Sequence, residues 1–481
     1  MVDSGNIGAS SLTAGLRGRR CARASFLTVV AATLIVSAAA EARKKQGQPV
    51  APPPIVEVDL PSSPNALTVR QYYERRQYPA IWFGTRGGDE AARQLLSILR
   101  RAPIDGMPEG PDVAARVEIA VQRARAGNDL MATKAAELAL SAAWADYVQA
   151  THRPSPNVIY GDPTLARSSP LPGQILRLAE AAPSLAQHLL TVSAINPIYA
   201  KLREVAAAEA SANGGRASDK ILLNLERSRL LPDTGKYIFV NTAEQRLHMV
   251  EDGQEVGTMK VVVGNKLKYG LPTPIVSSTM YYAVANPYWH VPPHLIRKFA
   301  PDIAKGPSAY LKAHGYEVIS DFSKHPTILA PSSVDWKAVA AGTLSVNLRQ
   351  RPGGNNSMGK MKFPFPNREG IYLHDTPNRE YFDSVKWPDR AQSNGCIRLE
   401  DYRRLANWLF GRDIAATGTQ PEQVLALPRG VRVYVTYLTM VPGPSDLTSF
   451  EDRYGWDRPG VVAGGMDTTV GTPLTTVGGQ R

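Results

Sequence analysis

Cysteine is scarce in this sequence, which has only Cys21 and Cys396 among 481 residues. Cys21 falls in an N-terminal stretch that we expect to be a targeting signal, so the remaining chain holds one thiol. A single cysteine excludes an internal disulfide and a metal site built from several cysteines. Exported proteins normally use cysteines in pairs, and a lone thiol in an oxidising compartment is a liability unless it has a function. Cys396 is therefore the first candidate for a reactive residue.

Two further absences narrow the class of protein. Only one apolar run, residues 24–40, approaches the length needed to cross a membrane. The net charge is +12, yet the globular part has no Lys/Arg-rich block with interleaved aromatic residues, so we expect no nucleic-acid partner. A basic surface of this kind suits an anionic membrane or an anionic wall polymer.

The N-terminus has the composition of a secretory signal. Arginines between positions 17 and 23 precede the apolar run, and small residues then offer cleavage sites after Ala40 or Ala42. We predict a signal peptide over residues 1–42; the alternative is an uncleaved anchor in the inner membrane. Residues 43–63 are basic and then proline-rich, which predicts an extended linker.

Residues 64–228 have the periodicity of helices. One helix should be capped by Asp89 and end before Pro103, with apolar side chains on one face. Three more helices are expected, over residues 132–150, 172–191 and 196–212. The aromatic and methionine side chains in this region fit a packed core, and we expect no cofactor.

The pattern changes near Gly235 to short runs rich in Val, Ile and Tyr, which predict β-strands. The expected strands cover residues 236–242, 246–250, 258–263, 279–285, 371–374 and 431–438, and a helix is expected over residues 400–410. The long mixed stretch between residues 287 and 370 indicates a lid, a binding loop or an inserted subdomain. We therefore predict an α+β fold, with a helical domain over residues 64–228, a β-rich domain over residues 235–438 and a disordered tail over residues 458–481.

The most informative segment places a histidine and the lone cysteine near one another. His374 ends an expected strand, and Cys396 follows Ser393, Asn394 and Gly395. A thiol needs a base or a cation to become a thiolate, and histidine suits that task near neutral pH. The glycine permits a tight turn, and the backbone N–H groups of Gly395 and Cys396 could face an oxyanion. These are the parts of acyl transfer.

The same residues resemble the signature of L,D-transpeptidases with a YkuD-type domain. His374 is followed, after sixteen residues between Thr376 and Ser393, by Ser-x-Gly-Cys-x-Arg. Further likenesses to large Gram-negative members lie at Gly264, Thr273-Pro274 and residues 286–292, 349–367, 224–227 and 450–457, and the helical half is similar to their scaffold domain. The resemblance covers about residues 65–457 and implies a capping insert over residues 289–370 and a C-terminal extension over residues 439–457.

The resemblance implies a periplasmic enzyme acting on peptidoglycan stem peptides. Cys396 would attack the donor tetrapeptide at its third residue, release D-alanine and pass the acyl group to an amine of an acceptor stem, giving a 3→3 crosslink. His374 would act as general base and acid, and Arg398 would orient the loop or bind a carboxylate, with a structural salt bridge as the alternative. Asn394 stands where many members have histidine. A backbone carbonyl is the first candidate for the group that orients His374, and Asp375 is the second.

Several alternatives remain open. A sortase would have a Thr-x-Thr-Cys strand end, and papain-like or NlpC/P60-type peptidases place cysteine before histidine. Resolution of the thioester by water or a free D-amino acid would give an L,D-carboxypeptidase or exchange enzyme, and a non-catalytic wall-binding scaffold is a further possibility. His290, His294 and His325 do not have the spacing of a metal site. We therefore expect no metal and no cofactor.

Overall fold

The structure of the protein is a computed structural model that describes residues 63–461, apart from 128, 167–168, 415–418 and 444–445. The predicted signal and nearly all of the predicted linker and tail lie outside the described residues. Within them, no helix combines the length and the apolar character that a membrane crossing requires.

The N-terminal part of the described chain is helical. Its helices are α2 (Ala66–Arg75), α3 (Gly88–Arg101), α4 (Gly110–Ala126), α5 (Leu130–His152), α6 (Pro172–Ala181), α7 (Leu185–Ala194), α8 (Pro197–Ala212) and α9 (Asp219–Ser228). They are joined in part by the short strand β1 (Ile159–Tyr160) and the 3-10 turn η1 (Pro163–Leu165). Two details differ from the sequence-based prediction. Pro183 interrupts the single helix expected over residues 172–191, and Ser184 caps α7 by accepting from the Gln187 N–H. The cap of α3 is Gly87 at φ +80°, whereas Asp89 lies in its first turn.

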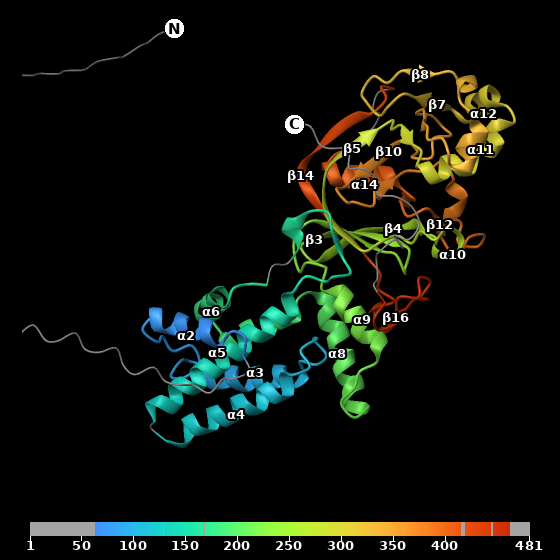
Figure 1. Ribbon diagram of the computed structural model, residues 1–481. Helices are drawn as coiled ribbons and strands as arrows, with labels where there is room; N and C mark the ends of the chain where they lie inside the picture. Colours follow the sequence, from blue (N-terminus) through green and yellow to red (C-terminus); the bar gives the residue numbers. More distant parts are fainter. Residues whose placement is uncertain (1–62, 128, 167–168, 415–418, 444–445, 462–481) are drawn as a thin grey trace, which may run out of the picture. The chain divides into compact units, whose positions relative to one another are not determined.

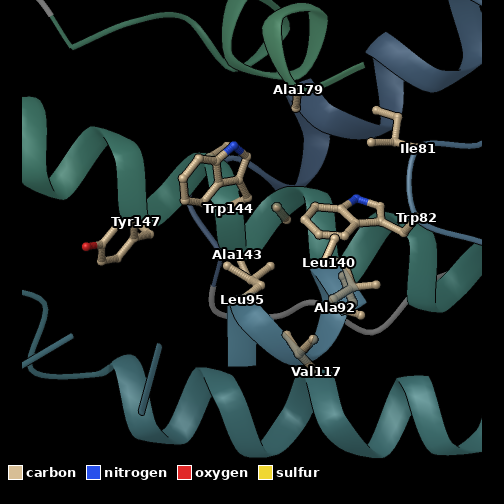
Figure 2. Packing of buried hydrophobic residues seen from close by; sticks show 14 of the residues in the cluster. Ile81, Trp82, Ala92, Leu95, Val117, Leu140, Ala143, Trp144, Tyr147 and Ala179 are labelled. Atoms are coloured by element: carbon tan, nitrogen blue, oxygen red, sulfur yellow. The ribbon is translucent and has the colours of Figure 1, made fainter. Parts of the chain in front are cut away.

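The helices share a core in which two tryptophans are almost fully buried. Trp144 comes from α5 and Trp82 from the loop before α3, and both lie beside Leu95 of α3 and Val117 of α4 (Figure 2). Burying rings of this size stabilises the helical packing more than the helix propensities of the segments do.

A buried carboxylate organises the loop that carries Trp82. Glu137 of α5 accepts from the backbone N–H groups of Ile81, Trp82 and Phe83, at 2.5, 2.9 and 3.0 Å, and from the Tyr73 hydroxyl at 3.1 Å. These four donors offset the cost of burying the charge, although burial still raises the pKa of Glu137. The loop is thus fixed by one side chain of α5.

The β-rich part is built from a sheet that closes on itself. Its strands are β2 (Tyr237–Asn241), β3 (Arg246–Glu251), β4 (Gln254–Gly264), β5 (Val276–Ala285), β10 (Met361–Pro364), β11 (Tyr372–His374), β13 (Ile397–Leu399) and β14 (Gln423–Thr436). Neighbours run in the order β5-β10-β11-β13-β4-β3-β2-β14, and β14 pairs again with β5 (Figure 1). Two short strands add to the rim, because β1 pairs with β5 and β12 (Ala391–Ser393) pairs with β4. Helix α14 (Tyr402–Phe410) packs its apolar face on this sheet.

The segment between β5 and β10 forms a small unit with its own core. It contains α11 (Pro293–Ala304), α12 (Pro307–His314), α13 (Trp336–Ala341) and a sheet of β6 (Trp289–His290), β9 (Asn347–Gln350), β7 (Tyr316–Ile319) and β8 (Ile328–Leu329). A 3-10 turn, η2 (Pro331–Ser333), precedes α13. Trp336 and Leu348 lie at the centre of its apolar cluster.

The chain after β14 returns to helix α9. Strands β15 (Met440–Pro442) and β16 (Leu447–Ser449) form a hairpin whose Met440 and Leu447 pack on the cluster of α8 and α9. Arg227 of α9 is buried and paired with Asp457 at 2.6 Å. The predicted fold class is confirmed, with a helical N-terminal part followed by a β-rich part that carries helices of its own.

Candidate active site

Strands β11 and β13 bring His374 and Cys396 to one face of the sheet. They are parallel neighbours, with Leu373 beside Ile397 and His374 beside Arg398. Side chains alternate between the two faces, so Leu373 and Ile397 enter the barrel core while His374 and Arg398 point the other way. Cys396, one residue before Ile397, falls on the face of His374 and Arg398. Strand spacing and rise place the α-carbons of Cys396 and His374 about 8 Å apart.

The Cys396 thiol is half-buried and held by backbone groups. Its Sγ lies 3.7 Å from the Gly370 carbonyl oxygen, to which it donates, and the Tyr372 N–H faces the sulfur. Burial raises the pKa of the thiol, and the Tyr372 N–H and the charge of Arg398 lower it by less. The resting group is therefore a neutral thiol, and it is the only free cysteine of the described chain.

His374 is buried, with 3% of its surface exposed. Its Nδ1 lies 2.5 Å from the backbone carbonyl oxygen of Asp375, which leaves Nε2 to face the site. Burial and the charge of Arg398 lower the pKa of His374 to about 3. The imidazole is thus neutral at pH 7 and able to accept a proton. Within the described residues its ring makes no hydrogen bond to Cys396, so the thiol must turn from Gly370 before a proton can pass.

The turn before Cys396 requires glycine. Gly395 has φ +109°, and a Cβ there would stand 3.1 Å from the Ile371 side chain. Thr273 fixes the turn by donating to the Gly395 carbonyl at 2.7 Å and accepting from the Gly264 N–H at 2.8 Å. Ser393 fixes it from inside by donating to the Cys396 carbonyl at 2.6 Å.

One sequence-based prediction about this turn needs correction. The N–H of Gly395, predicted to face an oxyanion, donates instead to the Ser393 hydroxyl at 3.2 Å. An oxyanion donor must be aimed at the reacting carbonyl. Gly395 therefore shapes the turn, and the Cys396 N–H is the remaining backbone donor of the two that the sequence named.

Arg398 is the cation of the site, and it has no carboxylate partner within ion-pair distance in the described chain. Its guanidinium lies 5.5 Å from the centre of the Tyr381 ring and is hydrogen-bonded to the Tyr381 hydroxyl. The salt bridge considered as an alternative is therefore not present among the described residues. The Asn394 side chain is half-buried and makes no hydrogen bond to His374 in this part of the chain.

The Asp375 carboxylate does not contact the imidazole. It accepts from the Lys360 N–H at 2.8 Å and pairs with Arg379. Arg379 also donates to the carbonyl of Glu400, just beyond β13, at 2.7 Å. Asp375 and Arg379 thus tie the peptide whose carbonyl holds His374 to the end of the strand that follows Cys396.

The unit between β5 and β10 reaches the edge of this site. Lys298 of α11 lies 5.3 Å from the centre of the Tyr269 ring, and the Tyr269 hydroxyl is close enough to Arg398 to influence its pKa. Tyr269 ends α10 (Lys266–Tyr269), the short helix after β4. His290 and His294 lie in the same unit, and no group of three or more metal-ligating side chains is found among the described residues.

Sequence reasoning missed the aromatic partners of the site. Tyr381 lies in η3 (Arg379–Phe382), inside the sixteen-residue gap, and nothing in the local pattern shows that it returns to Arg398. Tyr372, by contrast, was within reach of sequence reasoning, because a residue two before His374 on a strand shares its face.

Two family models match the chain. Residues 235–435 match the L,D-transpeptidase catalytic domain named YkuD, and residues 67–205 match a domain named Scaffold. A Haemophilus influenzae protein provisionally named an L,D-transpeptidase is 30% identical over 249 residues, which span 50% of this chain and 48% of that protein.

Solved structures were compared as well. One is titled a carbamoyl enzyme of Ldtfm with avibactam, at 15% identity and a TM-score of 0.20, covering 43% of this chain and 50% of that one. The other is an L,D-transpeptidase from Xylanimonas cellulosilytica, at 16% identity and a TM-score of 0.17, covering 47% of this chain and 76% of that one.

Proposed function

The chain belongs to the L,D-transpeptidase family with a YkuD-type catalytic domain, and we propose that it crosslinks peptidoglycan through a thioester on Cys396. The observation that carries the proposal is the shared face of β11 and β13. A neutral thiol, a neutral imidazole and an unpaired guanidinium lie together there, next to a turn held by Thr273 and Ser393.

In the first half-reaction, Cys396 Sγ attacks the carbonyl carbon of the third residue of a donor tetrapeptide. The thiol proton moves to Nε2 of His374 as the C–S bond forms, because neither group is charged at rest. The proton then passes to the amine of the departing D-alanine as the C–N bond breaks. The products are a thioester and free D-alanine.

In the second half-reaction, an amine of an acceptor stem attacks the thioester carbonyl. His374 takes a proton from this amine and returns one to the leaving sulfur, so the thiol is regenerated and a 3→3 amide bond remains. The Asp375 carbonyl supports both steps, since it fixes the ring with Nδ1 protonated.

Arg398 has two tasks in this proposal. Its charge favours the negative charge that develops on sulfur and on the carbonyl oxygen. Its free N–H groups can also hold a carboxylate of the donor stem in a bidentate fork. Stacking on Tyr381 keeps the guanidinium in place for either task.

We also propose that the protein works in the periplasm, with residues 1–42 as its export signal or inner-membrane anchor. The support is the order of arginines, apolar run and small residues. Fusion of these residues to a reporter that is active only after export should give activity, and an inactive fusion would overturn this part.

The reaction is tested by incubating the purified protein with tetrapeptide muropeptides and weighing the products. We expect release of D-alanine and a dimer linked at position three, and neither from Cys396→Ala. Tripeptide without dimer would indicate hydrolysis, and an exchanged terminal residue would indicate transfer to a free D-amino acid. Full turnover by Cys396→Ala would refute the proposal.

A further inference from the structure

A second cavity, lined by none of the catalytic residues, has a volume of about 620 Å³. Its walls come from the segment after α5, from α9 and from Pro459. The polar side chains that line it are Arg153, Ser155, Tyr160, Asp219, Glu226 and Arg229. Pro154 and Pro156 stiffen the segment that carries Arg153, so this wall is fixed before any ligand arrives.

Two guanidinium groups meet at this cavity. A Cβ built on Gly106 would stand 3.2 Å from an Nη atom of Arg229 and 3.8 Å from one of Arg153, so these two atoms are at most about 7 Å apart. Gly106 has φ +82°, which favours glycine and leaves this space open. Like charges at this separation repel unless an anion lies between or beside them.

The described structure supplies no such anion. Asp105 is the nearest buried carboxylate, but both of its oxygens are occupied by Arg203, Tyr147 and Tyr199. Arg229 reaches only the backbone carbonyl of Asp105, and its buried Nε has no hydrogen-bond partner among the described residues. Arg153 makes no ion pair within the same residues. Buried donors without a partner are rare in folded proteins, so Arg229 indicates a missing ligand group.

The opposite wall has the complementary charge. Glu226 accepts from the Ser155 hydroxyl at 2.6 Å through one oxygen, and Asp219 is exposed in the first turn of α9. Stacking on Tyr199 holds Arg229 on its side of the cavity. A ligand that fits both walls carries carboxylates and an amine on a chain of peptide size.

We propose that this cavity binds a peptidoglycan stem peptide by its carboxylates, as a capture site separate from the thiol. The inference rests on the proposed function for its ligand, because a stem peptide combines carboxylates with the amine that an acceptor supplies. Such a site would hold the polymer near the enzyme and raise the effective concentration of stems at Cys396.

The test uses the full chain with its thiol alkylated, so that no turnover occurs, and a soluble tripeptide stem as the probe. Binding is measured by calorimetry for the parent protein, Arg153→Ala and the control Arg216→Ala, which removes an exposed arginine outside the cavity. We expect Arg153→Ala to weaken one class of sites at least about tenfold, the effect of losing a charge-assisted hydrogen bond, and Arg216→Ala to match the parent.

Two results would overturn the inference. One is equal tripeptide affinity of Arg153→Ala and the parent protein. The other is displacement of the tripeptide from these sites by inorganic phosphate or acetate at equal concentration, which would show a general anion site. Acylation of Cys396 by tetrapeptide, followed on unalkylated protein, reports on the proposed function alone. The two proposals can therefore fail independently.

Discussion

At the scale of single residues, the reacting pair is a neutral thiol beside a neutral imidazole. Many cysteine enzymes hold a thiolate next to an imidazolium, but here burial raises the pKa of Cys396 and lowers that of His374. Proton transfer must therefore accompany the attack. The base is in its active form over the whole neutral range.

This arrangement predicts an unusual pH profile for acylation. With a His374 pKa of about 3, the rate constant should stay level between about pH 5 and pH 8 and fall only in stronger acid. An ordinary histidine base would instead give an inflection near pH 6.5. Stopped-flow acylation across this range decides between them, and an inflection near pH 6.5 would contradict the neutral pair.

The same shift predicts a pH dependence of stability. The unfolded chain binds a proton on His374 below about pH 6.5, whereas the folded protein does so only near pH 3. The free energy of unfolding should therefore fall as the pH drops through this window. His374→Ala should lose that part of the slope in urea titrations at several pH values, and an unchanged slope would refute the assignment.

At the scale of elements, the turn before Cys396 depends on a neighbouring loop. Thr273 bonds both Gly395 and Gly264, and all three are buried. Thr273→Val leaves both partners without a bond, so we expect a loss of about 1–3 kcal/mol in unfolding free energy and slower acylation. Thr191→Val, on the exposed face of α7, is the control for both measurements. Wild-type acylation by Thr273→Val would show that the turn needs no such brace.

The loop that carries Trp82 offers a second test at this scale. Glu137→Ala removes the acceptor of three backbone N–H groups, so we expect the protein to lose about 3 kcal/mol of unfolding free energy. Glu118→Ala breaks an exposed ion pair with Arg100 and should cost under about 1 kcal/mol. Equal losses in denaturant titrations would refute the proposed role of Glu137.

The sequence predicted the periodic features of the fold and of the site. The alternation that defines strands also shows that His374 and Leu373 face opposite sides, and the scarcity of thiols identified Cys396. The direction of single polar groups was not predictable. That the Gly395 N–H turns to Ser393, and that Tyr381 stacks on Arg398, follow from contacts between segments distant in sequence. Pro183 was visible in the sequence, and the uninterrupted helix predicted over residues 172–191 gave it too little weight.

At the scale of the whole molecule, α9 joins the C-terminal hairpin to the end of the barrel. Its buried Arg227 donates to the Tyr437 and Trp456 carbonyls and pairs with Asp457, while Asn224 bonds Thr439. The segment after β14 is therefore part of the folded structure up to this residue. It also supports the site, because the Tyr454 hydroxyl donates to the Gly264 carbonyl at 2.8 Å.

Arg227→Ala should therefore destabilise the protein strongly. Removing one partner of a buried pair leaves the Asp457 charge uncompensated, at a cost of about 3–5 kcal/mol. Arg125→Ala breaks an exposed pair with Asp89 and should change stability by less than about 1 kcal/mol. Thermal and denaturant unfolding of both variants gives the comparison, and similar midpoints would contradict the role given to α9.

The most direct measurement is the intact mass of the protein, trapped within the first turnovers on a tetrapeptide stem. The account predicts an adduct with the mass of the stem less its terminal D-alanine, mapped by proteolysis to the peptide that holds Cys396, and a much slower adduct in His374→Ala. Crosslinked product without any adduct on Cys396, or an adduct on another residue, would contradict it.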